Sequence, residues 1–187
     1  MNDRWRTLSN AAAWIWLGGS LCLSFIVAPA IFSSELRPAL SKEQAGLAAQ
    51  AVLKRHFFFQ CACSALMCVG MIAQTRTAKP CLHNTRKFLW ALATILVLLG
   101  GLWLAPKLSA LHQQMYPQLY GLPATTIPIE PLKSAFGKWH GMAQLANLAV
   151  MIGIGLWLIL AGRDARSAAT SINSSSADSG SGARERA

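Results

Sequence analysis

Three polar side chains within one long apolar stretch are the residues of this chain best suited to chemistry. His140, Gln144 and Asn147 follow one another at spacings of four and three, so at about 100° per residue they share one face of a helix. No charged residue lies between Lys138 and Arg163. That interval exceeds the roughly 20 apolar residues with which a helix crosses a bilayer. Because an unpaired polar group in hydrocarbon costs several kcal/mol, we expect this face to turn toward other helices.

Histidine binds metals and carries protons near neutral pH, so the other histidines bear on what this face can do. His56 and His140 each begin an apolar stretch, and we expect them at the same depth in the membrane. His112 lies six residues past Pro106, which places it about 9 Å further out if the helix continues. With Glu35, these histidines form a candidate site for a divalent metal, and His56 with His140 a candidate pair of haem ligands. The competing interpretation, which we favour, is that they bond to backbone, water or neighbouring helices.

The composition is that of a membrane protein. The chain is 53% hydrophobic and 13% charged, whereas soluble proteins average about 25% charged residues. Its formal net charge of +10 comes from Lys and Arg in short groups at the edges of apolar runs. Such charges fix orientation in a membrane, and without a basic patch we expect no nucleic-acid partner. The five cysteines, an odd number, imply no disulfide framework.

Four apolar runs predict an all-α integral membrane bundle whose helices run up, down, up and down. The expected spans are residues 11–32, 50–73, 88–106 and 139–161. They divide the chain into an N-terminal segment (1–10), a transmembrane domain (11–162) and a tail (163–187) that is rich in Ser and Gly. The tail has too few apolar residues to form a core, so we expect it to be disordered.

Two short motifs near the first two spans bear on a signal peptide and on the start of the second helix. The basic start and Ala28-Pro29-Ala30 also resemble a signal peptide with its cleavage site, an alternative that N-terminal sequencing of the mature protein would test. Ser41-Lys-Glu-Gln44 has the form of a capping box and predicts that the second helix begins there, before the membrane.

The charged residues favour an orientation with both termini in the cytoplasm. The loop at 74–87 is compact, basic and free of acidic residues, whereas Glu35, Glu43 and Glu130 lie in segments on the opposite side. Because cytoplasmic loops carry the excess of Lys and Arg, that loop and both termini are expected inside.

Glycine and proline mark the expected helix contacts. Gly137 and Gly141 form a G-x-x-x-G step, which lets another helix approach closely. Gly101 belongs to a face of small residues in the third span. Pro29 is expected to kink the first span by removing a backbone donor; alternatively, a carbonyl exposed there lines a polar pocket with His140.

Three segments resemble a known family. They are Phe25-Ile-Val-Ala-Pro29-Ala-Ile-Phe32, Ala45-Gly46, and Phe136-x-x-x-His140-Gly with Asn147. Together they resemble the four-span domain of unknown function shared by bacterial membrane proteins and animal transmembrane protein 205, over roughly residues 11–161.

The resemblance implies a multi-pass protein of a cell membrane, the bacterial inner membrane, with no established reaction. For the animal relative it implies a link to drug resistance and secretory trafficking. It directs attention to Pro29, Phe32, Gly46, His140 and Asn147. The family usually has a small hydroxyl residue two or three positions after the histidine, where this chain has Met142 and Ala143.

We expect a non-enzymatic scaffold or assembly partner without a cofactor, because no nucleophile with a matched base and no phosphate loop is evident. Its expected partners are the lipid bilayer and a second copy or another membrane protein. The alternative is a small oligomeric transporter or metal-handling protein. Four spans without an internal repeat are few for an alternating-access carrier, so a transporter of this size would need to dimerise.

Overall fold

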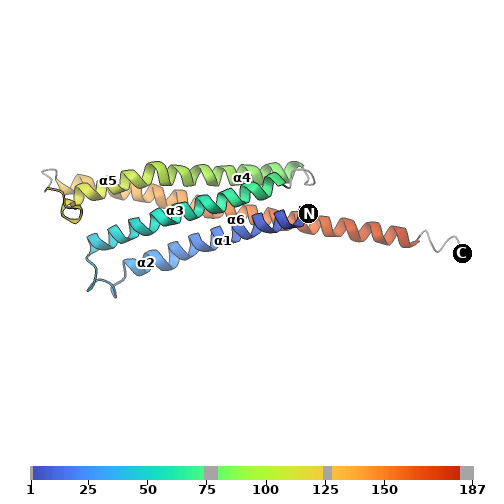
Figure 1. Cartoon of the computed structure of the whole chain (residues 1–187), viewed down its shortest axis with the longest axis horizontal. Helices are drawn as coiled ribbons and strands as arrows, with labels where there is room; N and C mark the ends of the chain where they lie inside the picture. Colours follow the sequence, from blue (N-terminus) through green and yellow to red (C-terminus); the bar gives the residue numbers. More distant parts are fainter. Residues whose placement is uncertain (1, 74–79, 124–127, 182–187) are drawn as a thin grey trace.

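The computed structural model describes residues 2–73, 80–123 and 128–181, and within them the chain forms helices and turns without a strand. Four long helical rods lie side by side in a bundle (Figure 1). In chain order the helices are α1 (Asn2–Cys22), the π-helix η1 (Leu23–Val27), α2 (Ala28–Ile31), α3 (Lys42–Ala73), α4 (Pro80–Leu99), the π-helix η2 (Gly100–Leu104), α5 (Ala105–Met115), the 3₁₀-helix η3 (Pro117–Tyr120) and α6 (Ile129–Ser181). The first rod comprises α1, η1 and α2, and the third comprises α4, η2 and α5.

Each rod contains a stretch that is long and apolar enough to cross a membrane. These stretches are Arg4–Ile31, Lys42–Ala73, Asn84–Met115 and Ile129–Arg163. The outer surface is rich in exposed apolar side chains such as Phe25, Ile72, Phe88 and Leu145, which suit contact with lipid. The predicted all-α bundle is therefore confirmed, and the chain is a multi-pass membrane protein.

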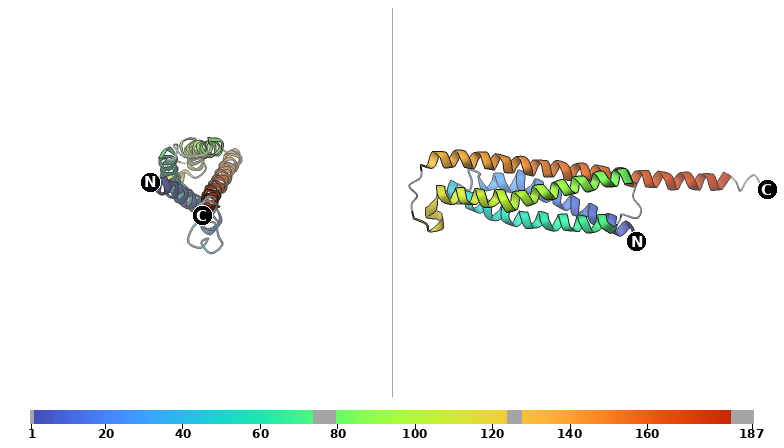
Figure 2. Two further views of the ribbon diagram at one scale, coloured as in Figure 1. Left: turned by 90° about the vertical axis from the view of Figure 1, so that its right-hand side faces the viewer. Right: turned by 90° about the horizontal axis from the view of Figure 1, so that it is seen from above.

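The rods form two hairpins that close into one bundle. α1 packs along α3, and α4 packs along α6. α6 also contacts α1, whereas the contact between α3 and α4 is smaller. The end-on view of Figure 2 shows the rods grouped around a common centre. We call the end at which α1 begins the proximal end, and the end with the turn at 32–41 and η3 the distal end.

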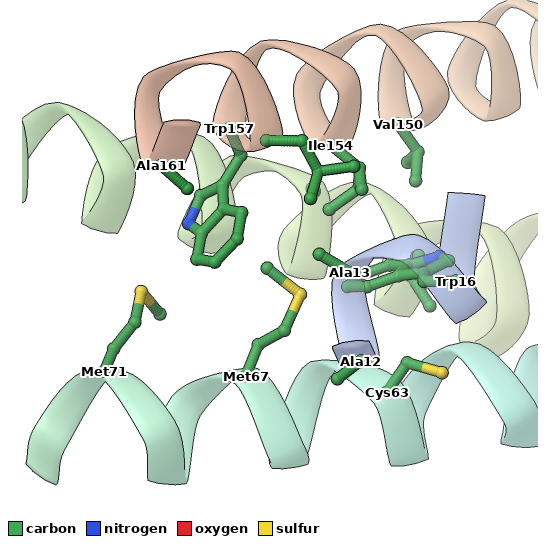
Figure 3. Packing of buried hydrophobic residues seen from close by; sticks show 13 residues of the cluster. Ala12, Ala13, Trp16, Cys63, Met67, Met71, Val150, Ile154, Trp157 and Ala161 are labelled. Atoms are coloured by element: carbon green, nitrogen blue, oxygen red, sulfur yellow. The ribbon is translucent and has the colours of Figure 1, made fainter. Parts of the chain in front are cut away.

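A cluster of buried apolar side chains lies toward the proximal end, and Figure 3 shows how its members pack together. Trp16, Met67, Ile154 and Trp157 are fully buried there and come from three different rods. Burial of side chains of this size stabilises the bundle through close packing, which is the main attraction between helices in lipid.

A glycine sets the distance between α1 and α3. A Cβ atom at Gly70 would lie 2.7 Å from the Cβ atom of Ser9 and 2.9 Å from the backbone oxygen of Trp5. The two backbones are therefore closer than any larger residue at Gly70 would allow.

The capping box predicted for the second helix is present. The backbone N–H of Ser41 donates to Oε1 of Gln44 (2.9 Å), and the backbone N–H of Gln44 donates to the Ser41 hydroxyl (3.3 Å). These reciprocal bonds satisfy donors that the first turn of α3 leaves open.

The first and third rods each contain a π-helix just before an Ala-Pro step, at Ala28-Pro29 and at Ala105-Pro106. The N–H of Ala28 donates to the oxygen of Leu23, and that of Ala105 to the oxygen of Gly100. Proline has no N–H and its ring crowds the carbonyl four residues earlier, so a wider turn accommodates it. The effect predicted for Pro29 thus takes the form of a π-turn, through which the helix continues to Ile31.

α6 continues as a helix to Ser181 and projects beyond the proximal end of the bundle (Figures 1 and 2). The sequence analysis instead predicts a disordered tail from residue 163. No proline occurs between Arg163 and Ser181, and adding residues to an existing helix is far easier than starting one. The low apolar content that predicted disorder therefore does not stop the helix at the edge of the bundle.

Candidate functional site

A buried serine joins α1 to α3. The Ser20 hydroxyl lies 3.4 Å from Nε2 of His56 and accepts a hydrogen bond of 3.5 Å from Nε2 of Gln60. Ser20 and Gln60 are buried, and the ring of His56 stacks on Phe59 at 5.5 Å between centroids. His56, a predicted site residue, therefore bonds across a helix boundary.

A second serine, one turn further along the first rod, joins η1 to α6. Nδ2 of Asn147 donates to the Ser24 hydroxyl at 3.1 Å. Asn147 is half-buried and turns toward the neighbouring rod, as the sequence analysis predicts. Ser20 and Ser24 thus receive polar groups from the rods on both sides, and we call them the serine pair. Sequence reasoning missed this pair, although two serines four residues apart in an apolar run would have indicated it.

A third polar contact joins α3 to α4. The hydroxyl oxygens of Ser64 and Thr94 lie 2.7 Å apart. The indole N–H of Trp90 donates to the backbone oxygen of Ser64 at 3.0 Å, and the Thr94 hydroxyl donates to the backbone oxygen of Trp90 at 2.8 Å. Each polar group in this contact has a partner, as an apolar environment requires.

His140 and Gln144 lie on the outside of α6. Both are exposed, and their Nε2 atoms are 3.1 Å apart. The prediction that this face as a whole turns inward is therefore wrong for these two residues. The difference comes from where along the membrane normal α6 has a neighbour. α6 contacts the first rod at the level of Asn147, but closer to the distal end, at the level of His140 and Gln144, the first rod continues as α2 and contacts mainly α3. Helical periodicity gives the direction of a side chain but not where its neighbour ends.

His112 is buried at the distal end among aromatic rings. Its Nδ1 lies 2.9 Å from the hydroxyl of Tyr120, and its ring centroid lies 5.0 Å from that of Tyr116 and 6.3 Å from that of Phe136. A Cβ atom at Gly46 would lie 2.7 Å from Nε2 of His112. The structure thus gives a physical reason for Gly46, a residue of the family resemblance: only glycine leaves room for this ring.

The expected histidine cluster is not assembled. His56 lies ten residues beyond Gly46, the neighbour of His112, which is about 15 Å along α3. His140 contacts Phe136 and Gln144, and Glu35 is exposed in the turn after α2. Over residues 2–73, 80–123 and 128–181, no group of three or more His, Cys, Asp or Glu side chains could hold a metal ion.

The expected haem pair also has separate surroundings. Nε2 of His56 lies beside Ser20, whereas Nε2 of His140 lies beside Gln144 on the surface of α6. The prediction that these two histidines face a common site is therefore wrong. Pro29 is likewise exposed on the first rod, and the pocket proposed between its carbonyl and His140 is not among the contacts of either residue.

The three glycines predicted for helix packing differ in their surroundings. Gly101 lies directly against the ring of Phe57, where an added Cβ atom would overlap it. In the part of the chain that the structure describes, a Cβ atom added at Gly137 or Gly141 meets nothing within 4 Å except its own chain neighbours and the nearby backbone of α6. Gly101 thus serves the contact between η2 and α3, whereas the G-x-x-x-G step is open on the surface of α6.

Two cations lie over tryptophan rings, one toward each end of the bundle. The buried guanidinium of Arg86 lies 4.2 Å from the ring centroid of Trp157. At the distal end, Nζ of Lys107 lies 3.6 Å from the ring centroid of Trp139, which meets Trp103 edge to face at 5.2 Å. Both contacts hold the third rod against α6, and sequence reasoning missed them because cation–π pairs far apart in the chain leave no local pattern.

Comparison with known proteins gives one match. The model of the family described as "Domain of unknown function (DUF4149)" matches residues 11–117, more than half of the chain. The matched part includes the serine pair, His56 and His112, whereas His140, Gln144 and Asn147 lie beyond it. No curated protein and no solved structure matches the chain.

Proposed function

The chain belongs to the DUF4149 family, a domain of unknown function, and on that premise we propose that it is a non-enzymatic membrane scaffold or assembly partner. One observation carries the proposal. Three pairs of polar side chains in its apolar helices bond across helix boundaries, at Ser20 with His56, at Ser24 with Asn147 and at Ser64 with Thr94.

These bonds suit a structural role. In lipid, hydrogen bonds between helices add to close packing and are worth about 0.6 kcal/mol each on average. They link α1 to α3, η1 to α6 and α3 to α4, while ring and cation contacts link the third rod to α6. The polar groups thereby fix the order and register of the rods.

The proposed location is the inner membrane of a bacterium, with both termini in the cytoplasm and no nucleic-acid partner. The Lys and Arg residues of segment 74–87 and the acidic residues of the opposite segments support this orientation. The distal end, with His112 and η3, then faces away from the cytoplasm. The likeness to animal transmembrane protein 205 supports the same class of protein, and fusions of reporter enzymes to both termini test the orientation.

Substitution of the bonded polar residues tests the structural role. We expect His56→Ala and Asn147→Leu each to lower the melting temperature of the purified protein in detergent, because each loses a bond between rods. Gln144→Leu is the matched control when all variants are melted at concentrations at which the chain is monomeric, since within one chain Gln144 bonds to its helical neighbour His140. Unchanged melting of His56→Ala and Asn147→Leu, together with loss of a bound metal or of a transport signal, would instead support the transporter or metal-handling alternative.

A further inference from the structure

We infer that the chain pairs with a second copy of itself through the outward face of α6, formed by Gly137, His140, Gly141 and Gln144. This inference rests on the proposed function, because it names the partner that the scaffold assembles. We call these residues the α6 face.

The α6 face lies where α6 passes from charged to apolar residues, with the exposed Lys138 beside it and exposed leucines beyond it. His140 and Gln144 are exposed within residues 139–162, a part of α6 that carries no charged residue. Nearby exposed residues of the same helix include Leu145 and Leu148. Polar side chains in such a stretch rarely face lipid, because hydrocarbon offers them no hydrogen-bond partner.

The hydrogen bond between His140 and Gln144 leaves the pair self-complementary. If the amide of Gln144 donates to Nε2 of His140, the neutral ring carries its proton on Nδ1, and the Oε1 atom of Gln144 remains an acceptor. If the amide is turned over, donor and acceptor exchange places. Either arrangement leaves one donor on one residue and one acceptor on the other.

A two-fold axis would satisfy both groups at once. In a symmetric dimer the same patch meets itself, so the donor of each copy faces the acceptor of the other and two equal bonds form. Two copies inserted in the same direction also place their α6 faces at the same depth. A second copy therefore matches this face in both chemistry and position without any further adjustment.

The glycines leave room for this approach. Among the described residues, nothing beyond the chain neighbours and the nearby backbone of α6 lies within 4 Å of a Cβ atom added at Gly137 or Gly141. Gly137, Gly141 and Gln144 lie within about 60° of one another around the helix axis, so the open backbone and the polar pair belong to one side. A second α6 helix is thus able to approach closely enough for bonds between short side chains.

Photo-crosslinking in native membranes tests the inference. Leu148 lies one turn beyond Gln144, on the same side of the helix as the α6 face, and the exposed Ala149 points about 100° away from Leu148. We expect a photoreactive phenylalanine at Leu148 to give a crosslinked dimer of this chain and the same group at Ala149 to give little. Equal dimer yields at both positions, crosslinks at Leu148 to lipid only, or crosslinks there to a different protein would each overturn the inference.

A second measurement separates this inference from the proposed function. We expect Gln144→Leu to raise the dissociation constant of the dimer in detergent about tenfold, because two bonds across the axis are lost, while the melting temperature of the monomer is unchanged. An unchanged dissociation constant would refute the α6 face. Dimerisation that persists while His56→Ala and Asn147→Leu leave melting unchanged would refute the structural role of the interior bonds instead.

Discussion

The contact between His112 of α5 and Gly46 of α3 allows the most specific prediction, because the two helices are far apart in sequence and are closely packed at this point. The methyl group of Gly46→Ala would lie 2.7 Å from Nε2 of His112, inside van der Waals contact. The ring cannot easily retreat, since it is buried, lies 2.9 Å from the hydroxyl of Tyr120 and packs against Tyr116. We therefore expect Gly46→Ala to reduce the free energy of unfolding by about 1–3 kcal/mol, the usual cost of overpacking.

The companion change removes the ring. His112→Ala loses the contact with the Tyr120 hydroxyl, worth about 1 kcal/mol, and ring contacts worth about 0.5–1.5 kcal/mol each. The expected loss is about 2–4 kcal/mol. In the double variant the alanine methyl enters space that the ring has left, so the clash that makes Gly46→Ala costly no longer exists. The two losses should then sum to at least about 1 kcal/mol more than the loss of the double variant.

Unfolding of the four proteins in mixed micelles measures this coupling. Gly153→Ala is the control for the first site, because nothing lies within 4 Å of a Cβ atom added at Gly153, and it should show no coupling to His112→Ala. If the losses in free energy of unfolding of Gly46→Ala and His112→Ala add to within about 0.5 kcal/mol of the loss of the double variant, the His112 ring does not contact Gly46 as the structure shows.

Three further predictions concern other contacts. Asn147→Leu should reduce the free energy of unfolding by about 0.6–2 kcal/mol, whereas Gln144→Leu should not reduce that of the monomer; a chemical-denaturation series in micelles compares them. Gly70→Ala should cost about 1–3 kcal/mol through its contact with α1, whereas Gly18→Ala, which meets no other atom, should be neutral or stabilising by up to about 1 kcal/mol; thermal melts that rank them the other way would contradict the crossing of α1 and α3. Trp90→Phe should cost about 1 kcal/mol through loss of its indole bond, and a shift in melting temperature measures it.

Much of the fold is predictable from the sequence because its signals are local. Span length and hydropathy require only the composition of a window, and the capping box at Ser41 and Gln44 requires residues three apart. The C-terminal segment differs: the composition of residues 163–187 predicts disorder, whereas α6 continues to Ser181, and residues 182–187 lie outside the described part of the chain. Local composition indicates whether a segment can form a core, which is a different property from whether a helix must stop.

The site is less predictable because it depends on depth and on partners far away in the chain. His140 and Asn147 differ by only about 20° around α6, yet one is exposed and the other is bonded to Ser24. The spacing of these residues does not indicate at which residue the contact between the first rod and α6 ends. The pairing of Gly46 with His112 joins residues 66 positions apart, and periodicity within either helix carries no information about it.

The two ends of the bundle differ in a way that bears on function. The proximal half is held by large buried side chains, with Trp16 and Trp157 in close contact with other core residues. The distal half contains both π-helices, the serine pair, the His112 cluster and the open α6 face. Apolar packing tolerates little change in volume, whereas π-turns and polar contacts mark positions at which a helix departs from regular geometry. The proximal half is therefore stabilised mainly by apolar packing and the distal half mainly by polar and aromatic contacts, and the α6 face that we propose as a dimer contact lies in the distal half.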